Sequence, residues 1–267
     1  MTEKTEQIRV EYYIDTNPES PSAYERYITG TQQTDFSKYR TVVLDSFSGA
    51  LRSAKWAEQF LHNSSARGTA KLQWYGESAD RLERIVAGHL KSLPCNVIVI
   101  AHVGSKQDNV RGSLHWGIDG YGRLSTSLPR DFGEVYYLDV VEDQDGRKRY
   151  VCQTEKDDKF FAKTHLGIRN NFTVDYGGAF GNLLGNCTKI NLLTEDSFSI
   201  PLHILLYGDS GAGKSLFAAS FPKPMLVLHW DGYDNAIPYL EQGKEVSALK
   251  DYGDGEGPDT TKYHLVY

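Results

Sequence analysis

The chain has 267 residues, of which 40% are hydrophobic and 24% are charged, with 25 glycines and 9 prolines. This composition is typical of a globular protein and excludes disordered and collagen-like chains. The formal net charge of −6 argues against a protein that coats nucleic acid through bulk positive charge, but it leaves room for a local basic groove. The three cysteines, Cys95, Cys152 and Cys187, are too widely spaced for a disulfide framework or a zinc cluster.

Targeting signals are not evident in the sequence. No stretch reaches the roughly 18 apolar residues of a membrane span. The polar first seven residues lack the apolar core of a secretory signal. We therefore expect a cytoplasmic protein with no membrane partner.

The first part of the chain alternates between predicted strands and helices. Apolar runs predict strands at Ile8–Ile14, Thr41–Leu44, Asn96–Ala101, Val135–Val141 and Arg149–Gln153. Helical patterns cover Ser46–Leu61 and Ser78–Leu93, and Ser78 is the expected N-cap of the second. Residues 104–128 carry five glycines and scattered polar residues, which predicts a long loop.

The rest of the chain repeats this alternation after a glycine-rich stretch, 170–199, that we expect to be a linker. Strands are predicted at Ile204–Tyr207 and Met225–His229, with a helix at Lys214–Ser220 between them. Residues 251–267 begin as an acidic, glycine-rich tail. Strands alternating with helices predict a three-layer α/β fold with a mostly parallel sheet.

Residues 208–215 form the motif with the strongest chemical meaning. They read GDSGAGKS and fit G-x-x-x-x-G-K-[ST] between a predicted strand and a predicted helix. We expect all eight to bind the phosphates of ATP: Gly208, Asp209, Ser210, Gly211, Ala212, Gly213, Lys214 and Ser215. Backbone N–H groups can surround the phosphate oxygens, Lys214 can reach the β- and γ-phosphates, and the Ser215 hydroxyl can ligate Mg²⁺. A glycine-rich turn with a chance lysine is the alternative.

Side chains at the ends of other apolar strands are candidates to complete this site. Asp45 ends the strand VVLD and is predicted to share Mg²⁺ with Ser215; the alternative is an N-cap for the following helix. Asp231 follows the strand MLVLH and is a candidate to orient or deprotonate the attacking water, or else a plain turn aspartate. His102 follows NVIVIA and is placed to sense the γ-phosphate, or is simply a satisfied strand-end histidine.

Taken together, these residues resemble phage RecA-like ATPases of the Sak type, in which one RecA-like core supports single-strand DNA binding, annealing and recombination. The resemblance rests on GDSGAGKS, VVLDS, NVIVIAH with its following loop, and YVCQTEKDDKFFAKTH, and it covers 8–171 and 200–239. It implies a three-layer P-loop NTPase core, ATP and Mg²⁺ as cofactors, and a homo-oligomer that works with single-stranded DNA. A single-strand-binding protein is a further candidate partner.

The order of the motifs departs from that family, in which the P-loop precedes the VVLDS strand. The chain therefore looks circularly permuted. Residues 1–169 correspond to the C-terminal part of the core, 170–199 to a linker, 200–250 to the N-terminal part with the P-loop, and 251–267 to a tail with a final strand. A rearranged gene assembly or an engineered chain would give the same order. A true permutation needs neighbouring chain ends and a flexible new joint.

The resemblance also implies sites for DNA and for a neighbouring subunit. The 104–128 loop corresponds to a DNA-contacting loop, with Lys106, Arg111, Trp116, Tyr121 and Arg123 as candidate contacts. Cations can follow phosphates and aromatic rings can stack on bases; a solvated loop with a locally packed tryptophan is the alternative. Lys156 and Lys163 are candidates for the cation that completes an adjacent subunit's ATP site, or they belong to a charged surface.

These observations predict a single-stranded-DNA-dependent ATPase that acts in phage DNA recombination or annealing in the host cytoplasm. Lys214, Asp231 and His102 are its candidate catalytic residues. The first alternative is a DNA-annealing module that holds ATP structurally and hydrolyses little of it, because no clear catalytic glutamate stands out. A P-loop kinase is the second, although no lid-like arginine cluster accompanies the motif.

Overall fold

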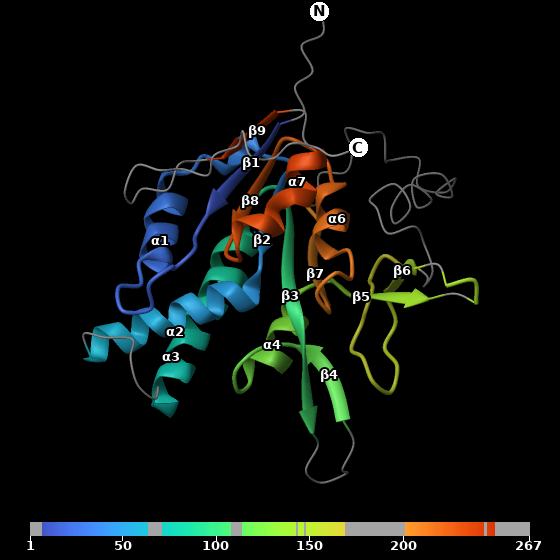
Figure 1. Cartoon of the computed structure of the whole chain (residues 1–267), viewed down its shortest axis with the longest axis horizontal. Coiled ribbons are helices and arrows are strands. Elements are labelled where there is room, and N and C mark those ends of the chain that lie inside the picture. Colours follow the sequence, from blue (N-terminus) through green and yellow to red (C-terminus); the bar gives the residue numbers. More distant parts are fainter. Residues whose placement is uncertain are drawn as a thin grey trace, which may run out of the picture.

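A single sheet forms the centre of the molecule. The computed structural model describes residues 7–63, 71–107, 114–142, 144–146, 148–168, 201–242 and 245–248. In this part of the chain, nine strands follow the order β6-β5-β7-β3-β2-β8-β1-β9, with β4 paired to β3 (Figure 1). The strands are β1 Gln7–Tyr12, β2 Thr41–Asp45, β3 Asn96–Gln107, β4 Leu114–Ile118, β5 Glu134–Glu142, β6 Lys148–Gln153, β7 His203–Gly208, β8 Met225–His229 and β9 Glu245–Ala248.

All neighbouring strands are parallel except in two pairs. β6 is antiparallel to β5, and β4 is antiparallel to β3. The seven strands predicted from apolar runs are all present, with their bounds shifted by a few residues. In β2, Val42 and Leu44 enter one buried cluster and Val43 enters the other, which explains why this strand is apolar throughout.

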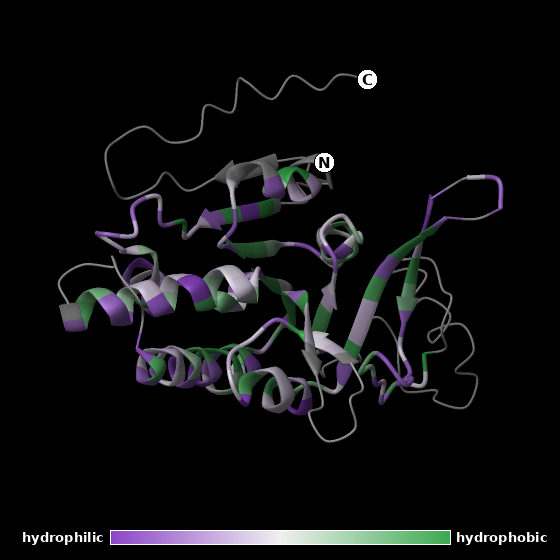
Figure 2. Cartoon of the chain, turned by 60° about the horizontal axis from the view of Figure 1, so that its bottom comes forward, coloured by the Kyte–Doolittle hydropathy of each residue, from purple (hydrophilic) through white to green (hydrophobic). Residues whose placement is uncertain are grey.

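Helices cover both faces of the sheet. They are α1 Ala23–Gln33, α2 Phe47–Asn63, α3 Leu72–Glu83, α4 Leu124–Asp131, α6 Lys214–Ala219 and α7 Ile237–Gln242. The helices α1, α2, α3 and α4 pack against one face through one buried hydrophobic cluster. The helices α6 and α7 pack against the other face through a second cluster. Hydrophobic residues follow the central strands, while hydrophilic residues gather on the helices and turns (Figure 2). The mostly parallel three-layer α/β fold is therefore confirmed.

No helix in the described part of the chain is long and apolar enough to cross a bilayer.

The predicted helix over 78–93 is wrong in its start and its course. α3 already begins at Leu72, and Ser78 lies inside it, where its hydroxyl donates to the carbonyl of Tyr75 at 3.1 Å. Ser78 is therefore not an N-cap. Beyond α3 the chain continues as a π-helix, Arg84–His89, and a 3-10 turn, Leu90–Ser92. Apolar residues follow a helix-like spacing in the π-helix and the 3-10 turn as well. The pattern alone therefore did not distinguish these segments from an α-helix.

The predicted long loop over 104–128 is also wrong. β3 continues to Gln107 and pairs with β4, and α4 begins at Leu124. This β3–β4 hairpin projects beyond the parallel strands (Figure 1), where burial does not impose an apolar pattern on its residues. The helix α1 and the strand β9 were not predicted either. The predicted linker 170–199 and tail 251–267 lie outside the described residues.

Candidate nucleotide-binding site

The GDSGAGKS turn joins β7 to α6 at the carboxyl end of the parallel strands. A side chain at Gly208 would collide with the carbonyl oxygen of Leu138 on β5, so only glycine allows the two strands to pair this closely. Gly213 has a φ of 82°, in the left-handed region that favours glycine. The turn therefore folds as the phosphate-binding motif requires.

Lys214 is the buried cation of this turn. It is only 7% exposed, and its Nζ donates to the carbonyls of Gly208 at 2.9 Å and Asp209 at 2.7 Å. Burial lowers its pKa, and the carboxylates of Asp45, Asp209 and Asp231 oppose that change. A charged amine held inside the loop by its carbonyls is positioned to bind phosphate oxygens.

Asp45 lies against the P-loop serine, although the two are far apart in sequence. Its Oδ2 accepts a 2.8 Å hydrogen bond from the Ser215 hydroxyl and a 2.6 Å bond from the hydroxyl of Tyr239. Asp45 itself is 4% exposed. A carboxylate and a hydroxyl side by side are oxygen donors of the kind that Mg²⁺ prefers, so this pair fits the metal site expected of such a motif.

Ser46, rather than Asp45, caps the amino end of the helix α2. The hydroxyl of Ser46 accepts a 3.1 Å hydrogen bond from the N–H of Gly49, in the first turn of α2. This leaves the Asp45 carboxylate directed at Ser215 and Tyr239 rather than at the start of the helix.

Asp231 and His102 meet beside this pair. Nε2 of His102 lies 3.6 Å from Oδ2 of Asp231, and a guanidinium nitrogen of Arg52 lies 3.8 Å from Oδ1. His102 pairs in register with Gly208, so it stands level with the first residue of the P-loop. Two candidates from separate strands are thus in contact at the edge that carries Lys214 and Asp45.

The environment of Asp231 favours its charged form. Burial alone would raise its pKa, but hydrogen bonds from His102 and Ser46 outweigh that effect, and the pKa lies below its ordinary value. Gly49 allows the close approach, because a Cβ there would lie 2.8 Å from Oδ1 of Asp231. The carboxylate is therefore ionised and can accept a proton or a hydrogen bond.

Sequence reasoning missed four residues of this site: Ser46, Gly49, Arg52 and Tyr239. Ser46 and Gly49 directly follow the VVLD strand, so the start of α2 was a usable signal. Tyr239 comes from α7 and is fully buried; burial, and then the Asp45 carboxylate, raises its pKa well above the ordinary value. No local pattern marked it, since only the packing of α7 brings it to Asp45.

The candidate DNA contacts lie in or after the β3–β4 hairpin. Trp116 is half-buried. Its backbone N–H donates to the backbone carbonyl of Lys159 at 2.8 Å, and the centroid of its ring lies 6.4 Å from that of Phe160. Lys106 pairs in register with His115 across the hairpin. Arg111 lies outside the described residues. The hairpin therefore presents Trp116 on an ordered backbone.

Two other candidates already have protein partners. The ring of Tyr121 packs edge-on against Tyr75 with centroids 4.7 Å apart, and burial raises its pKa. A guanidinium nitrogen of Arg123 lies 3.1 Å from Asp80 and 3.8 Å from Glu83 on α3. Contact with DNA would have to compete with these interactions.

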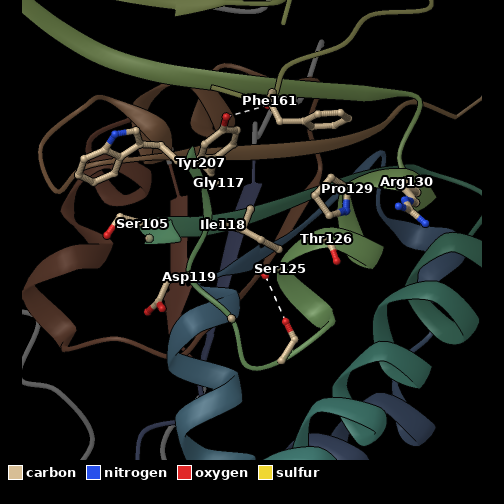
Figure 3. Close-up of a pocket in the computed structure, with 14 residues that line it drawn as sticks. Ser105, Gly117, Ile118, Asp119, Ser125, Thr126, Pro129, Arg130, Phe161 and Tyr207 are labelled. Carbon is tan, nitrogen blue, oxygen red and sulfur yellow. Dashed lines mark hydrogen bonds between the residues drawn. The ribbon is translucent and has the colours of Figure 1, made fainter. Parts of the chain in front are cut away.

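A cavity of about 470 Å³ opens beside the hairpin (Figure 3). Its wall includes Ser105 and Asp119 from the hairpin region, Thr126 and Arg130 from α4, and Phe161. The Tyr207 hydroxyl, which also lines it, donates to the carbonyl of Phe161 at 2.7 Å. The cavity thus lies between the hairpin and the strand that leads to the P-loop.

The two candidate cations for a neighbouring subunit lie at the β5 and β6 edge of the sheet. Lys156 is exposed, just beyond the end of β6. The backbone of Lys163 pairs with Val135, and its Nζ donates to the carbonyl of Arg130 at 3.3 Å. Burial lowers the pKa of Lys163, against the effect of Asp131 and Glu134. Val135 pairs with Leu205, three residues before Gly208. Lys163 therefore lies nearer to the amino ends of the parallel strands than the P-loop does.

Comparison with known proteins gives one match. The model of a protein family described as an AAA domain matches residues 2–166, which include β2 with Asp45 and β3 with His102 but not the P-loop. No curated protein and no solved structure matches the chain. Such a family match indicates a nucleotide-binding ATPase.

Proposed function

Because the chain belongs to this AAA domain family, we propose that it is a single-stranded-DNA-dependent ATPase of DNA recombination or annealing, similar to the phage Sak type. The observation that carries the nucleotide part is the hydrogen bond from Ser215 to Asp45, at 2.8 Å. It joins a P-loop outside the family match to an acidic strand inside it. The resemblance to phage recombination ATPases carries the DNA part.

The site residues can divide the work of ATP hydrolysis among them. Lys214 and the P-loop N–H groups bind the phosphates, while Ser215 and Asp45 hold Mg²⁺. When bound, Mg²⁺ neutralises charge on the phosphate oxygens. Asp231, ionised and oriented by His102, accepts a hydrogen bond or a proton from the attacking water.

We propose that DNA binds at the β3–β4 hairpin and affects the ATP site through β3. His102 lies on β3 between that hairpin and Asp231, and its carbonyl accepts a 2.8 Å hydrogen bond from the N–H of Asp119. A displacement of the hairpin would therefore reach the residue that orients Asp231. Lys156 or Lys163 would act on the ATP site of the next copy in a homo-oligomer.

A circular permutation is our proposal for the unusual motif order. Two observations support it. β7 lies between β3 and β5, and β8 lies between β1 and β2, so strands from both halves of the chain alternate in one sheet. The first and the last strand that the structure describes along the chain, β1 and β9, are hydrogen-bonded neighbours, and Gln7 lies opposite Glu245.

The test is ATP hydrolysis by the purified chain with and without single-stranded DNA. We expect DNA to stimulate turnover, and Lys214→Ala to abolish nucleotide binding because the phosphates lose their buried cation. Lys38→Ala is the matched control, because it removes an exposed lysine whose ammonium lies 3.5 Å from the Asp35 carboxylate. Unchanged nucleotide affinity in Lys214→Ala would overturn the P-loop assignment.

One observation favours a second function, an annealing module that holds ATP with little turnover. Asp231 already contacts both His102 and Arg52, and a carboxylate paired with a cation such as Arg52 is a weaker base. DNA binding that depends on ATP, without measurable hydrolysis, would select this function over the first.

A further inference from the structure

The two sides of the P-loop differ in chemistry. β7 has β3 on one side and β5 on the other. The β3 side carries the ionisable groups His102, Asp231 and Asp45. On the β5 side, Leu138 pairs with Gly208, and β5 then continues past the P-loop to Glu142. The antiparallel β5–β6 hairpin therefore lies beside the P-loop on the side away from Asp45 and Asp231.

Tyr150 lies on this hairpin, next to the P-loop backbone. Tyr150 pairs with Val140 across the hairpin. The buried pair Leu138 and Cys152, two residues away on each strand, lies on the same face of the sheet. A Cβ placed on Gly213 would lie 2.9 Å from Cδ1 and 3.3 Å from Cε1 of the Tyr150 ring. The ring therefore touches the P-loop at Gly213, yet Tyr150 remains 46% exposed.

The direction of a bound nucleotide follows from the residues that hold its phosphates. Ser215 and Asp45 form the metal pair, and Asp231 lies beyond them, so the terminal phosphate faces the β3 side. The phosphate chain must then lead the nucleoside the other way across the loop, toward the β5–β6 hairpin. On that side the exposed ring of Tyr150 touches the P-loop.

We propose that Tyr150 stacks on the base of the bound nucleoside triphosphate and forms the base subsite of this P-loop. This inference rests on the proposed nucleotide-binding function and adds to it the residue that distinguishes a nucleotide from bare phosphate. An exposed tyrosine suits the task, because its ring buries area at little conformational cost and every base offers a flat π-face. Gly213 leaves room for the ring beside the loop.

The experiment compares two ligands that share phosphates and differ in the base. Binding of Mg²⁺-ATP and of Mg²⁺-tripolyphosphate is measured by calorimetry for the full chain, Tyr150→Ala and Tyr150→Phe. Because one base–aromatic stacking contact is lost, we expect Tyr150→Ala to weaken the binding of ATP about tenfold. Its affinity for tripolyphosphate should stay unchanged, and Tyr150→Phe should bind both ligands as the parent chain does.

The controls separate this inference from the function beneath it. Leu72→Ala removes another exposed apolar side chain, on α3, and should alter neither affinity. Equal loss of ATP and tripolyphosphate binding in Tyr150→Ala would mean that the ring only supports the P-loop, and no loss of either would exclude contact with the base; both results overturn the inference but not the P-loop. If the parent chain bound neither ligand, the nucleotide-binding function itself would fail.

Discussion

Asp45 is held by two hydroxyl groups, and no motif marks the second of them. Ser215 belongs to the P-loop and is expected to turn toward Mg²⁺ when the metal binds. Tyr239 comes from α7, and its raised pKa keeps it protonated, so it donates to Asp45 throughout the ordinary pH range. It is a positioning residue, comparable to the outer ligands that orient carboxylates around metals.

We therefore predict that Tyr239→Phe lowers the affinity for Mg²⁺ and raises the half-saturating Mg²⁺ concentration of ATP turnover about tenfold or more. The measurement is a Mg²⁺ titration of hydrolysis at saturating ATP. Tyr136→Phe is the matched control, because Tyr136 is also buried and donates to a carboxylate, that of Glu134, at 2.6 Å. The same Mg²⁺ requirement in both variants would contradict a positioning role for Tyr239.

At the scale of elements, the β3–β4 hairpin connects the candidate ATP site with the proposed DNA site. Its first strand also carries His102 at the ATP site, and its second presents Trp116. The backbone of Trp116 is anchored to Lys159, so the tryptophan lies on a structured ribbon rather than on a solvated loop. The strand β3 therefore extends from the hairpin to the level of Gly208, which pairs with His102.

We predict that Trp116→Ala weakens binding of labelled single-stranded DNA about tenfold, as expected when one stacked base is lost. Fluorescence anisotropy measures this affinity. ATP binding without DNA should not change, which distinguishes loss of a DNA contact from general destabilisation. The proposed DNA site would be wrong if Trp116→Ala bound DNA as tightly as the parent chain.

At the scale of the whole molecule, the two halves of the chain cannot form separate sheets. Removal of β7 and β8 would open the sheet between β3 and β5 and between β2 and β1. The centres of both strands are fully buried and apolar, for example at Leu205 and Val227. Their loss would expose the centre of both buried clusters to water.

We predict that a reordered chain, in which 200–267 precedes 1–199, folds to the same structure and retains ATP affinity, because strand order in space does not depend on where the chain is opened. Thermal unfolding followed by circular dichroism, with ATP titration, measures this. A chain that ends at residue 168 is the contrasting case and should show no cooperative unfolding. Failure of the reordered chain to fold would reject the proposed permutation.

The sequence by itself determined seven of the nine described strands, the α/β class and the P-loop motif, because these depend on local patterns. Continuous apolar runs record burial on both faces of the sheet, and GDSGAGKS places its glycines where the backbone turns tightly. The same patterns misled outside the core: the β3–β4 hairpin and the start of α3 carry few signals of burial, so their form was not predicted correctly.

The motifs predicted that Asp45 and Ser215 share a site, but only the tertiary structure decided how they meet and which other residues join them. Asp45 and Ser215 are 170 positions apart in the chain, yet they share a hydrogen bond because β2 and β7 both flank β3 with their carboxyl ends at one edge. Tyr239 and Tyr150 reach the site through the packing of α7 and the pairing of β6. Such contacts depend on strand order across the sheet, which no local spacing of residues contains.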